Sequence, residues 1–305
     1  MTTTAAIDTL GLGLDAGGTK TRWALSAANG DLLAEGYVAG LTALQLGSSD
    51  GRAHIHATMI DLARQVLAVG QPRRVCAGVT GLDSRDEQLC DAIAAPLGLA
   101  GHSVNVHSDI EIACRDLFAP GEGYVVYAGT GSIAAFVDED GQLHRAGGRG
   151  VYLDDAGGGY WMAREALRHI WRREDEAPGA WRQSSLAVAM FRLIGGSEWA
   201  HSRQFFYTRE RGDIGQLAVA VAETVDSDAV SREIVCNAGR ELARLANAML
   251  NRFGERPMAL TGGAARAHPL IESHLRAGIP PHIVLTVRTA EAHIAASRIA
   301  ARTSN

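Results

Sequence analysis

A group of residues suited to binding phosphate stands near the start of the sequence, in the segment Asp15-Ala-Gly-Gly-Thr19-Lys20. This segment brings together a carboxylate, two glycines, a hydroxyl and an ammonium group. Successive backbone N–H groups in a glycine turn form a concave site for anions. A carboxylate beside such a site is favourable when a cation lies between the two negative groups, and Mg²⁺ is commonly bound by one or two carboxylates together with phosphates. Asp15 is therefore a candidate for binding Mg²⁺ through water; the alternative is a tight hairpin with an aspartate cap.

Two further glycine turns have the same character. Gly129-Thr130-Gly131-Ser132 follows one apolar segment, and Leu260-Thr261-Gly262-Gly263 ends another, which is where ligands bind in α/β sheets. Three such turns, in a chain whose strand pattern occurs twice, are typical of a nucleotide bound between two domains. Gly11-x-Gly13-x-x-Ala16 and Gly129-x-Gly131-x-x-Ala134 match the spacing of a dinucleotide fingerprint. The residues after them predict strands, however, and not the helix that this fingerprint requires.

The elements that must position these turns follow from hydrophobic spacing and turn residues. Residues 10–37 predict the order strand, glycine turn, strand, Asx-Gly turn and strand, and the same order returns in residues 124–143. This repeat indicates duplicated domains; two unrelated hairpins are the alternative. Strands that alternate with helices indicate an α/β fold. Helices are expected at residues 50–69, 86–97, 109–118, 160–173, 184–193, 214–225, 228–253, 267–275 and 290–301, and further strands at 74–79, 104–107, 257–260 and 283–287.

Composition limits the classes of protein that the sequence can encode. Its 305 residues suggest about two domains. The net charge of −5 does not attract nucleic-acid backbones. No apolar run reaches the roughly 18 residues of a membrane span, and the first residues lack the features of a signal peptide. The cysteines lack metal-site spacing and predict reduced thiols in a cytoplasmic protein. They are Cys76, Cys90, Cys114 and Cys236.

The motifs and their order resemble the sugar kinases in the superfamily of actin, hexokinase and the heat-shock chaperone ATPases. Within it the chain resembles the N-acetylglucosamine kinase and glucosamine kinase family of BadF/BadG/BcrA/BcrD-type ATPases, which also contains activator ATPases of benzoyl-CoA reductase. The segments that carry the resemblance are Gly13–Lys20, Val79–Gly81, His107–Asp109, Gly129–Ser132, Gly148–Trp161 and Leu260–Gly263.

This resemblance implies duplicated actin-like, ribonuclease H-like domains with an interdomain nucleotide cleft. Residues 1–119 would form the domain on the sugar and phosphate side. Residues 120–305 would form the nucleotide side, with a helical insertion that mediates a homodimer, and the final helix could pack back on the first domain. The implied cofactors are ATP and Mg²⁺, and the implied partner is a small-molecule sugar.

The resemblance also assigns roles to individual residues. Asp109 matches the catalytic base; without the resemblance, Ser108-Asp109 before an apolar run predicts a helix cap instead. The implied nucleotide-binding residues are Asp15, which would also hold Mg²⁺ through water, and Gly17, Gly18, Thr19, Lys20, Gly129, Thr130, Gly131, Gly262 and Gly263. The implied sugar-binding residues are Thr80, Asp109, Gly131, Asp155 and Gly159.

The implied activity is ATP-dependent transfer of the γ-phosphoryl group to the C6 hydroxyl of N-acetylglucosamine or glucosamine. Two departures from the family pattern leave the identity of the sugar open. Ala43 stands where the family usually has an asparagine that reaches the sugar, and Asp154-Asp155-Ala156-Gly157-Gly158 replaces Gly-Asp-Glu/Gln-Gly-Ser. One alternative is an activator ATPase, which would need cysteines to hold an iron–sulfur cluster. The other is a non-catalytic sugar sensor, which would not need Asp109.

Overall fold

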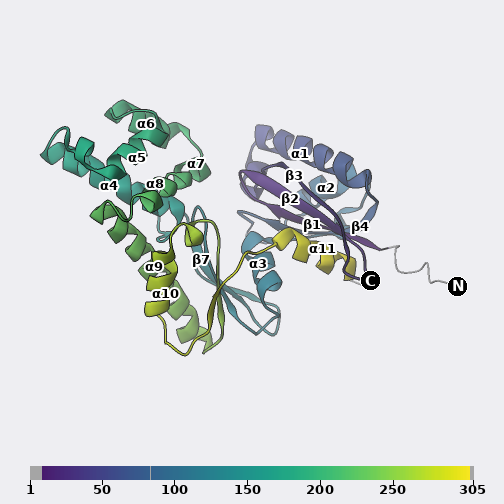
Figure 1. Ribbon diagram of the computed structural model, residues 1–305. Coiled ribbons are helices and arrows are strands. Elements are labelled where there is room, and N and C mark those ends of the chain that lie inside the picture. The colour runs from purple at the N-terminus through teal and green to yellow at the C-terminus, as the bar shows by residue number, and fades with distance from the viewer. Residues whose placement is uncertain (1–8, 83, 303–305) are drawn as a thin grey trace. The chain divides into compact units, whose positions relative to one another are not determined.

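The computed structural model describes residues 9–82 and 84–302 (Figure 1). Residues 1–8 lie outside this described part. They include the start of the sequence, where no signal peptide is predicted. The chain forms two compact units. One contains the residues up to Leu117 together with those from Ala290 onward, and the other contains Phe118–Thr289. Each unit has a mixed five-stranded sheet covered by helices, which confirms the expected α/β fold.

The sheet of the first unit has the strand order β3-β2-β1-β4-β5. β1, β2 and β3 form an antiparallel meander, and β4 and β5 then run parallel to β1. The expected hairpin turn at Asn29-Gly30 joins β2 to β3, with Gly30 at a φ of 92°. The strands are β1 Leu10–Ala16, β2 Lys20–Ser26, β3 Leu32–Ala39, β4 Pro72–Val79 and β5 Val104–Ser108.

Helices cover both faces of this sheet because successive side chains on a strand point to opposite faces. Val75 and Ala77 of β4 lie in one apolar core with the buried faces of α1 and α2, whereas Cys76 packs with α3 and α11 on the other face. One face of α1 is buried from Ile55 to Val66, whereas Leu67, the last residue of that helix, is 41% exposed. The helices are α1 Ser49–Leu67, α2 Glu87–Ala94, α3 Asp109–Leu117 and α11 Ala292–Arg302.

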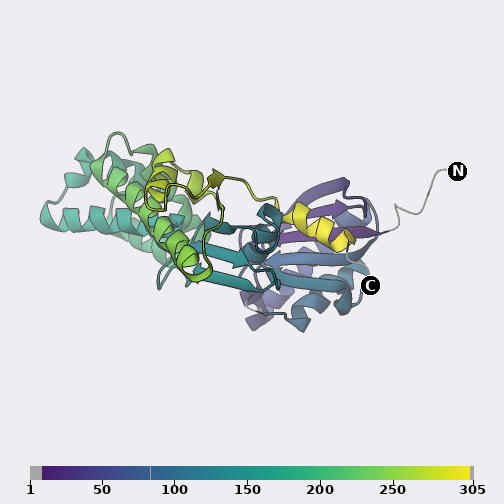
Figure 2. The same cartoon turned by 90° about the horizontal axis from the view of Figure 1, so that it is seen from below.

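α11 returns to the first sheet from the far end of the chain (Figure 2). Gly11 and Gly13 of β1 allow this close approach, because a Cβ atom at Gly13 would lie only 2.0 Å from the carbonyl oxygen of His293. The resemblance implied that the final helix belongs to the domain 120–305 and could pack back on the first domain. In the structure it packs on β1, β2 and β4 and belongs to the first compact unit.

The sheet of the second unit repeats this plan with the strand order β8-β7-β6-β9-β10. β6, β7 and β8 form the antiparallel meander, and β9 and β10 are parallel to β6. The repeat in the sequence is therefore a repeat of topology. The strands are β6 Tyr124–Ala128, β7 Ser132–Val137, β8 Leu143–Gly147, β9 Met258–Thr261 and β10 Leu285–Val287.

The helices of the second unit differ from the sequence prediction in two places. The single helix expected at residues 214–225 is two helices that meet at Leu217, since Gly215 is held beside Thr130 and α4. α6 was not expected, because only Ser202 of its residues is buried and the periodic apolar signal is weak. The helices are α4 Gly159–Glu176, α5 Ser185–Ile194, α6 Trp199–Thr208, α7 Arg211–Gln216, α8 Ala218–Glu223, α9 Ala229–Phe253 and α10 Pro269–Ala277. In the described part of the chain, no helix combines the length and apolarity that crossing a membrane requires.

Candidate active site

Three predicted site segments follow neighbouring strands of the first sheet. β1, β4 and β5 are parallel, and their register aligns the last residues of all three strands. The glycine turn 17–20, Thr80 and Asp109 come directly after these strands. They therefore lie at one edge of the sheet, the carboxyl edge at which α/β sheets bind ligands.

The first glycine turn presents free backbone amides. Gly17 N–H donates to the carbonyl oxygen of Lys20 at 3.1 Å and closes the turn. The N–H groups of Gly18 and Thr19 find no protein acceptor among the residues that the structure describes. Gly40 passes against this turn, where a Cβ atom would lie 2.3 Å from the carbonyl oxygen of Gly18. The role of Gly40 was not predicted, since a single glycine in a sequence does not indicate which distant segment packs against it.

Asp15 is the penultimate residue of β1, and its side chain is partly buried. Burial raises the pKa of this carboxyl group, and the nearby charge of Asp109 raises it further, while His293 and Arg22 act in the opposite direction. A divalent cation would relieve the cost of keeping two carboxylates close together. Within the described residues, no group of three or more His, Cys, Asp or Glu side chains could hold a metal ion. The donor set therefore fits Mg²⁺ bound through water and phosphate oxygens, and not a metal cage built from protein side chains.

The Asp109 carboxylate is turned towards the end of β4. Its Oδ2 accepts a hydrogen bond of 2.7 Å from the hydroxyl of Thr80, and its Oδ1 accepts one of 2.8 Å from the N–H of Ile110. A helix N-cap accepts instead from the backbone two or three residues further on. The hydrogen-bond partners of Asp109 are thus not those of the cap that its sequence context alone predicts.

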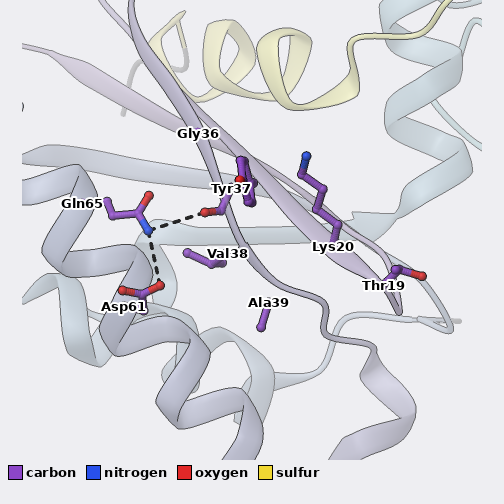
Figure 3. A pocket seen from close by; sticks show the side chains of 8 residues that line it. All are labelled: Thr19, Lys20, Gly36, Tyr37, Val38, Ala39, Asp61 and Gln65. Carbon is purple, nitrogen blue, oxygen red and sulfur yellow. Dashed lines mark hydrogen bonds between the residues drawn. The ribbon is translucent and has the colours of Figure 1, made fainter.

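Lys20 is the only lysine in the sequence. Its ammonium nitrogen lies 3.9 Å from the centre of the Tyr37 ring, within the range of a cation–π interaction. Figure 3 shows this side chain extending along Tyr37 and away from Thr19. It lines an open cavity of about 780 Å³ beside the edge strand β3. Asp61 and Gln65 of α1 form the other side of that cavity.

The second glycine turn has the same design in the second unit. Gly129 N–H donates to the carbonyl oxygen of Gly131 at 2.9 Å. The first amides of α4 take two carbonyls of the turn: Gly159 N–H donates to Gly129 at 2.8 Å and Tyr160 N–H to Thr130 at 3.0 Å. The N–H groups of Thr130 and Gly131 have no protein acceptor in the described ranges. Carbonyl groups face the helix, and a pair of amides is left for an anion.

Asp155 lies directly against this turn. It is the one non-glycine residue with positive φ, 53°, among those described. Its Oδ1 accepts a hydrogen bond of 3.0 Å from Gly150 N–H, and its Oδ2 would lie 2.2 Å from a Cβ atom at Gly131. Burial raises the pKa of the Asp155 carboxyl group, while the backbone amides of Gly150 and Arg149 oppose that shift. The structure thus brings Asp155 and Gly159, which are close in sequence, against the turn that contains Gly131, an earlier segment of the chain.

The third glycine turn follows β9 and stands next to the second. Gly262 has a φ of 106°, and a Cβ atom there would lie 2.2 Å from the carbonyl oxygen of Ala128, the last residue of β6. At Gly263 a Cβ atom would meet no atom of the described residues within 4 Å, so this residue borders open space. Two of the three predicted turns therefore share one edge of the second sheet.

The sequence profile of the BadF/BadG/BcrA/BcrD ATPase family matches residues 12–289. The chain belongs to this family. An N-acetyl-D-glucosamine kinase from Dictyostelium discoideum is 25% identical over 278 residues, which are 83% of this chain and 84% of that protein. These matches confirm the family to which the motifs pointed.

Solved structures confirm the fold of this family member. A protein from Chromobacterium violaceum, proposed to be an N-acetylglucosamine kinase, has a TM-score of 0.73 at 22% identity, with 96% of this chain and 99% of that chain covered. A ROK-family glucokinase from Streptomyces griseus, solved with glucose and AMPPNP, has a TM-score of 0.61 at 17% identity, with 96% and 100% covered.

Proposed function

We propose that the protein is an ATP-dependent sugar kinase that transfers the γ-phosphoryl group to the C6 hydroxyl of N-acetylglucosamine or glucosamine. The observation that carries the proposal is the position of Asp109. Its carboxylate is held by Thr80 at the same sheet edge as the glycine turn 17–20, whose amides are free for an anion. The N-acetylglucosamine kinase among the relatives supports the class of acceptor.

Asp109 is the proposed general base. A sugar hydroxyl is a weak nucleophile near neutral pH, and a carboxylate within hydrogen-bond reach orients it and accepts its proton while the bond to phosphorus forms. In this step the C6 oxygen forms the new bond to the γ-phosphorus, the bond to the β-phosphate oxygen breaks, and ADP leaves. Most of the acceleration then comes from positioning and from stabilisation of negative charge.

Two glycine turns are the proposed phosphate sites. The first unit contributes Gly17, Gly18, Thr19 and Lys20, and the second contributes residues 129–131. The free N–H groups in both turns support this role. Bound Mg²⁺ would neutralise charge on the phosphate oxygens, and Asp15 is the residue that would hold it, through water. Gly262 and Gly263 are the proposed contacts to the adenosine.

The proposed sugar contacts lie in both units. Thr80 and Asp109 come from the first, and Gly131, Asp155 and Gly159 come from the second. Ala43 offers no polar group to the sugar, so the acceptor must be identified by experiment. The exposed aromatic side chains Trp199 and Tyr207 of α6 support a homodimer through the helices of the second unit. The free cysteines are consistent with the cytoplasm as the proposed location.

The buried thiols disfavour an activator ATPase. Burial raises the pKa of both Cys76 and Cys114 to about 12. Both thiols are also buried, whereas the cysteines of an iron–sulfur cluster must be accessible to the iron that they bind. An iron assay on the purified protein tests this alternative. A non-catalytic sensor would bind sugar without releasing ADP.

A coupled assay of ADP release over a panel of hexoses and amino sugars tests the proposal. Asp109→Asn should lower turnover by about 100- to 10,000-fold, the usual contribution of a general base, with nucleotide affinity nearly unchanged. Asp50→Asn, an exposed acid on α1, is the matched control. Equal turnover in the wild type and Asp109→Asn would remove Asp109 as the base. Sugar binding without any ADP release would favour the sensor.

A further inference from the structure

We infer that Thr80 is a positioning residue, which orients the Asp109 carboxylate and ties it to the phosphate turn and to the loop that begins at Thr42. This inference rests on the proposed function, because it describes how that function's base is held. It gives Thr80 a role beyond that of a sugar ligand.

The hydroxyl of Thr80 has one proton to donate, and Asp109 receives it. The Oγ1–Oδ2 distance is 2.7 Å, within the range of strong hydrogen bonds to a charged acceptor. Oδ1 is held separately, by the N–H of Ile110 at 2.8 Å. With a partner on each oxygen, the carboxylate cannot rotate without breaking a hydrogen bond. Acceptor sites remain on both oxygens, since a carboxylate has about four.

The backbone of Thr80 is itself held from two sides. Its N–H donates to the carbonyl oxygen of Ala16 at 2.9 Å, directly before the phosphate turn. Its carbonyl oxygen accepts from the N–H of Ala43 at 3.0 Å. A Cβ atom at Gly17 would lie 4.0 Å from Thr80 Oγ1, so the hydroxyl stands beside the turn as well. Thr80 therefore connects three segments that come together only at this sheet edge.

The loop that Thr80 reaches through Ala43 is also internally fixed. Thr42 and Gln45 form a capping box at the start of the short 3₁₀ helix Ala43–Gly47, in which Thr42 N–H donates to the side-chain oxygen of Gln45 at 2.9 Å. Leu44 of the same helix packs over the position of Gly81, the residue after Thr80. Movement of this loop would therefore be transmitted to the residue that holds Asp109.

The two roles for Thr80 predict different kinetic effects. A hydroxyl that only binds the sugar would change the KM of the sugar when removed. A hydroxyl that orients the base would change kcat, because a small misplacement of a reacting group can cost up to about 100-fold in rate. The proton of Thr80 is already donated to Asp109, so towards the sugar this hydroxyl can act only as an acceptor.

The experiment compares Thr80→Val with Thr80→Ser. Valine keeps the shape and removes the hydroxyl, whereas serine keeps the hydroxyl. We expect Thr80→Val to lower kcat by about 10- to 100-fold, with the KM of sugar and of ATP changed by less than about threefold, and Thr80→Ser to restore most of the loss. Thr21→Val is the matched control, since the Thr21 hydroxyl is buried and has no hydrogen-bond partner among the described residues. Circular dichroism and thermal unfolding establish that each variant is folded, and Thr80→Ser carries the comparison if the valine variant is not.

A double-mutant cycle with Asp109→Asn separates positioning from a general structural effect. If Thr80 acts through Asp109, Thr80→Val should not lower kcat further in the Asp109→Asn variant. The inference would be overturned if the two substitutions lowered kcat independently, so that their effects multiplied in the double variant, or if Thr80→Val changed only the KM of the sugar. Asp109 would remain the base in either case. If the wild type phosphorylates no sugar of the panel, or Asp109→Asn turns over as fast as the wild type, the proposed function fails and this inference fails with it.

Discussion

The contact between Gly131 and Asp155 gives the sharpest test of the site in the second unit. In Gly131→Ala the new Cβ atom would lie 2.2 Å from Asp155 Oδ2 and 2.9 Å from its Cγ. Ordinary contacts between non-bonded carbon atoms begin near 3.5 Å, so the carboxylate must move by about 1 Å. Asp155 cannot move freely, because Gly150 N–H holds Oδ1 and its backbone is in the left-handed region.

The cost of this change follows from overpacking and misplacement. Inserting a methyl group into a closely packed site destabilises a protein by about 1–3 kcal/mol. If Asp155 binds the sugar, a displacement of about 1 Å lowers kcat/KM by up to about 100-fold. Urea denaturation measures the first effect and the coupled ADP assay the second. Gly47→Ala is the control for the glycine-to-alanine change, since in the described part of the chain a Cβ atom at Gly47 would meet nothing within 4 Å.

A double variant isolates the contact itself. Asp155→Ala removes the carboxylate, and its remaining Cβ atom would lie an acceptable 3.4 Å from the Cβ atom of alanine at position 131. Adding Gly131→Ala to Asp155→Ala should therefore cost much less stability than it costs in the wild type. The reasoning would be refuted if Gly131→Ala alone had wild-type stability and activity, or if the cost were the same in both backgrounds.

Two further predictions concern the first unit. Asp15→Asn should raise the free energy of unfolding at pH 7 while lowering kinase turnover, because the folded state raises the pKa of this acid above its ordinary 3.8. An ionised acid of this kind destabilises the folded state; the penalty is absent below pH 3.8 and complete above the raised pKa. Denaturant titrations without nucleotide check this, and an asparagine variant less stable than the wild type at pH 7 would contradict it. Lys20→Met should raise the KM of ATP by about tenfold, the value of one charged contact, and Lys20→Arg should recover most of it. An unchanged KM in the methionine variant would exclude Lys20 from the nucleotide site.

Much of the fold can be predicted from the sequence, because its signals are local. The run before Asp15 is apolar and Asn29-Gly30 is a hairpin signal, so β1, β2 and β3 follow from neighbouring residues alone. The same patterns after Gly123 predict the second meander, and together they reveal the repeat. The break at Leu217 escaped prediction because Gly215 is held beside Thr130, which is distant in the sequence, and α6 escaped it because its periodic apolar signal is weak.

The candidate site also has features that the sequence predicts and others that only the tertiary structure shows. The sequence by itself predicted which segments are suited to binding phosphate, because glycines, a hydroxyl and an acid lie within a few residues of one another. Only the tertiary structure decided that Thr80 meets Asp109, that Asp155 meets Gly131, and that α11 closes the first sheet. The physical reason is that strand order is not a local property. β4 pairs with both β1 and β5 through crossovers of many residues, and only that pairing brings their carboxyl ends to one edge.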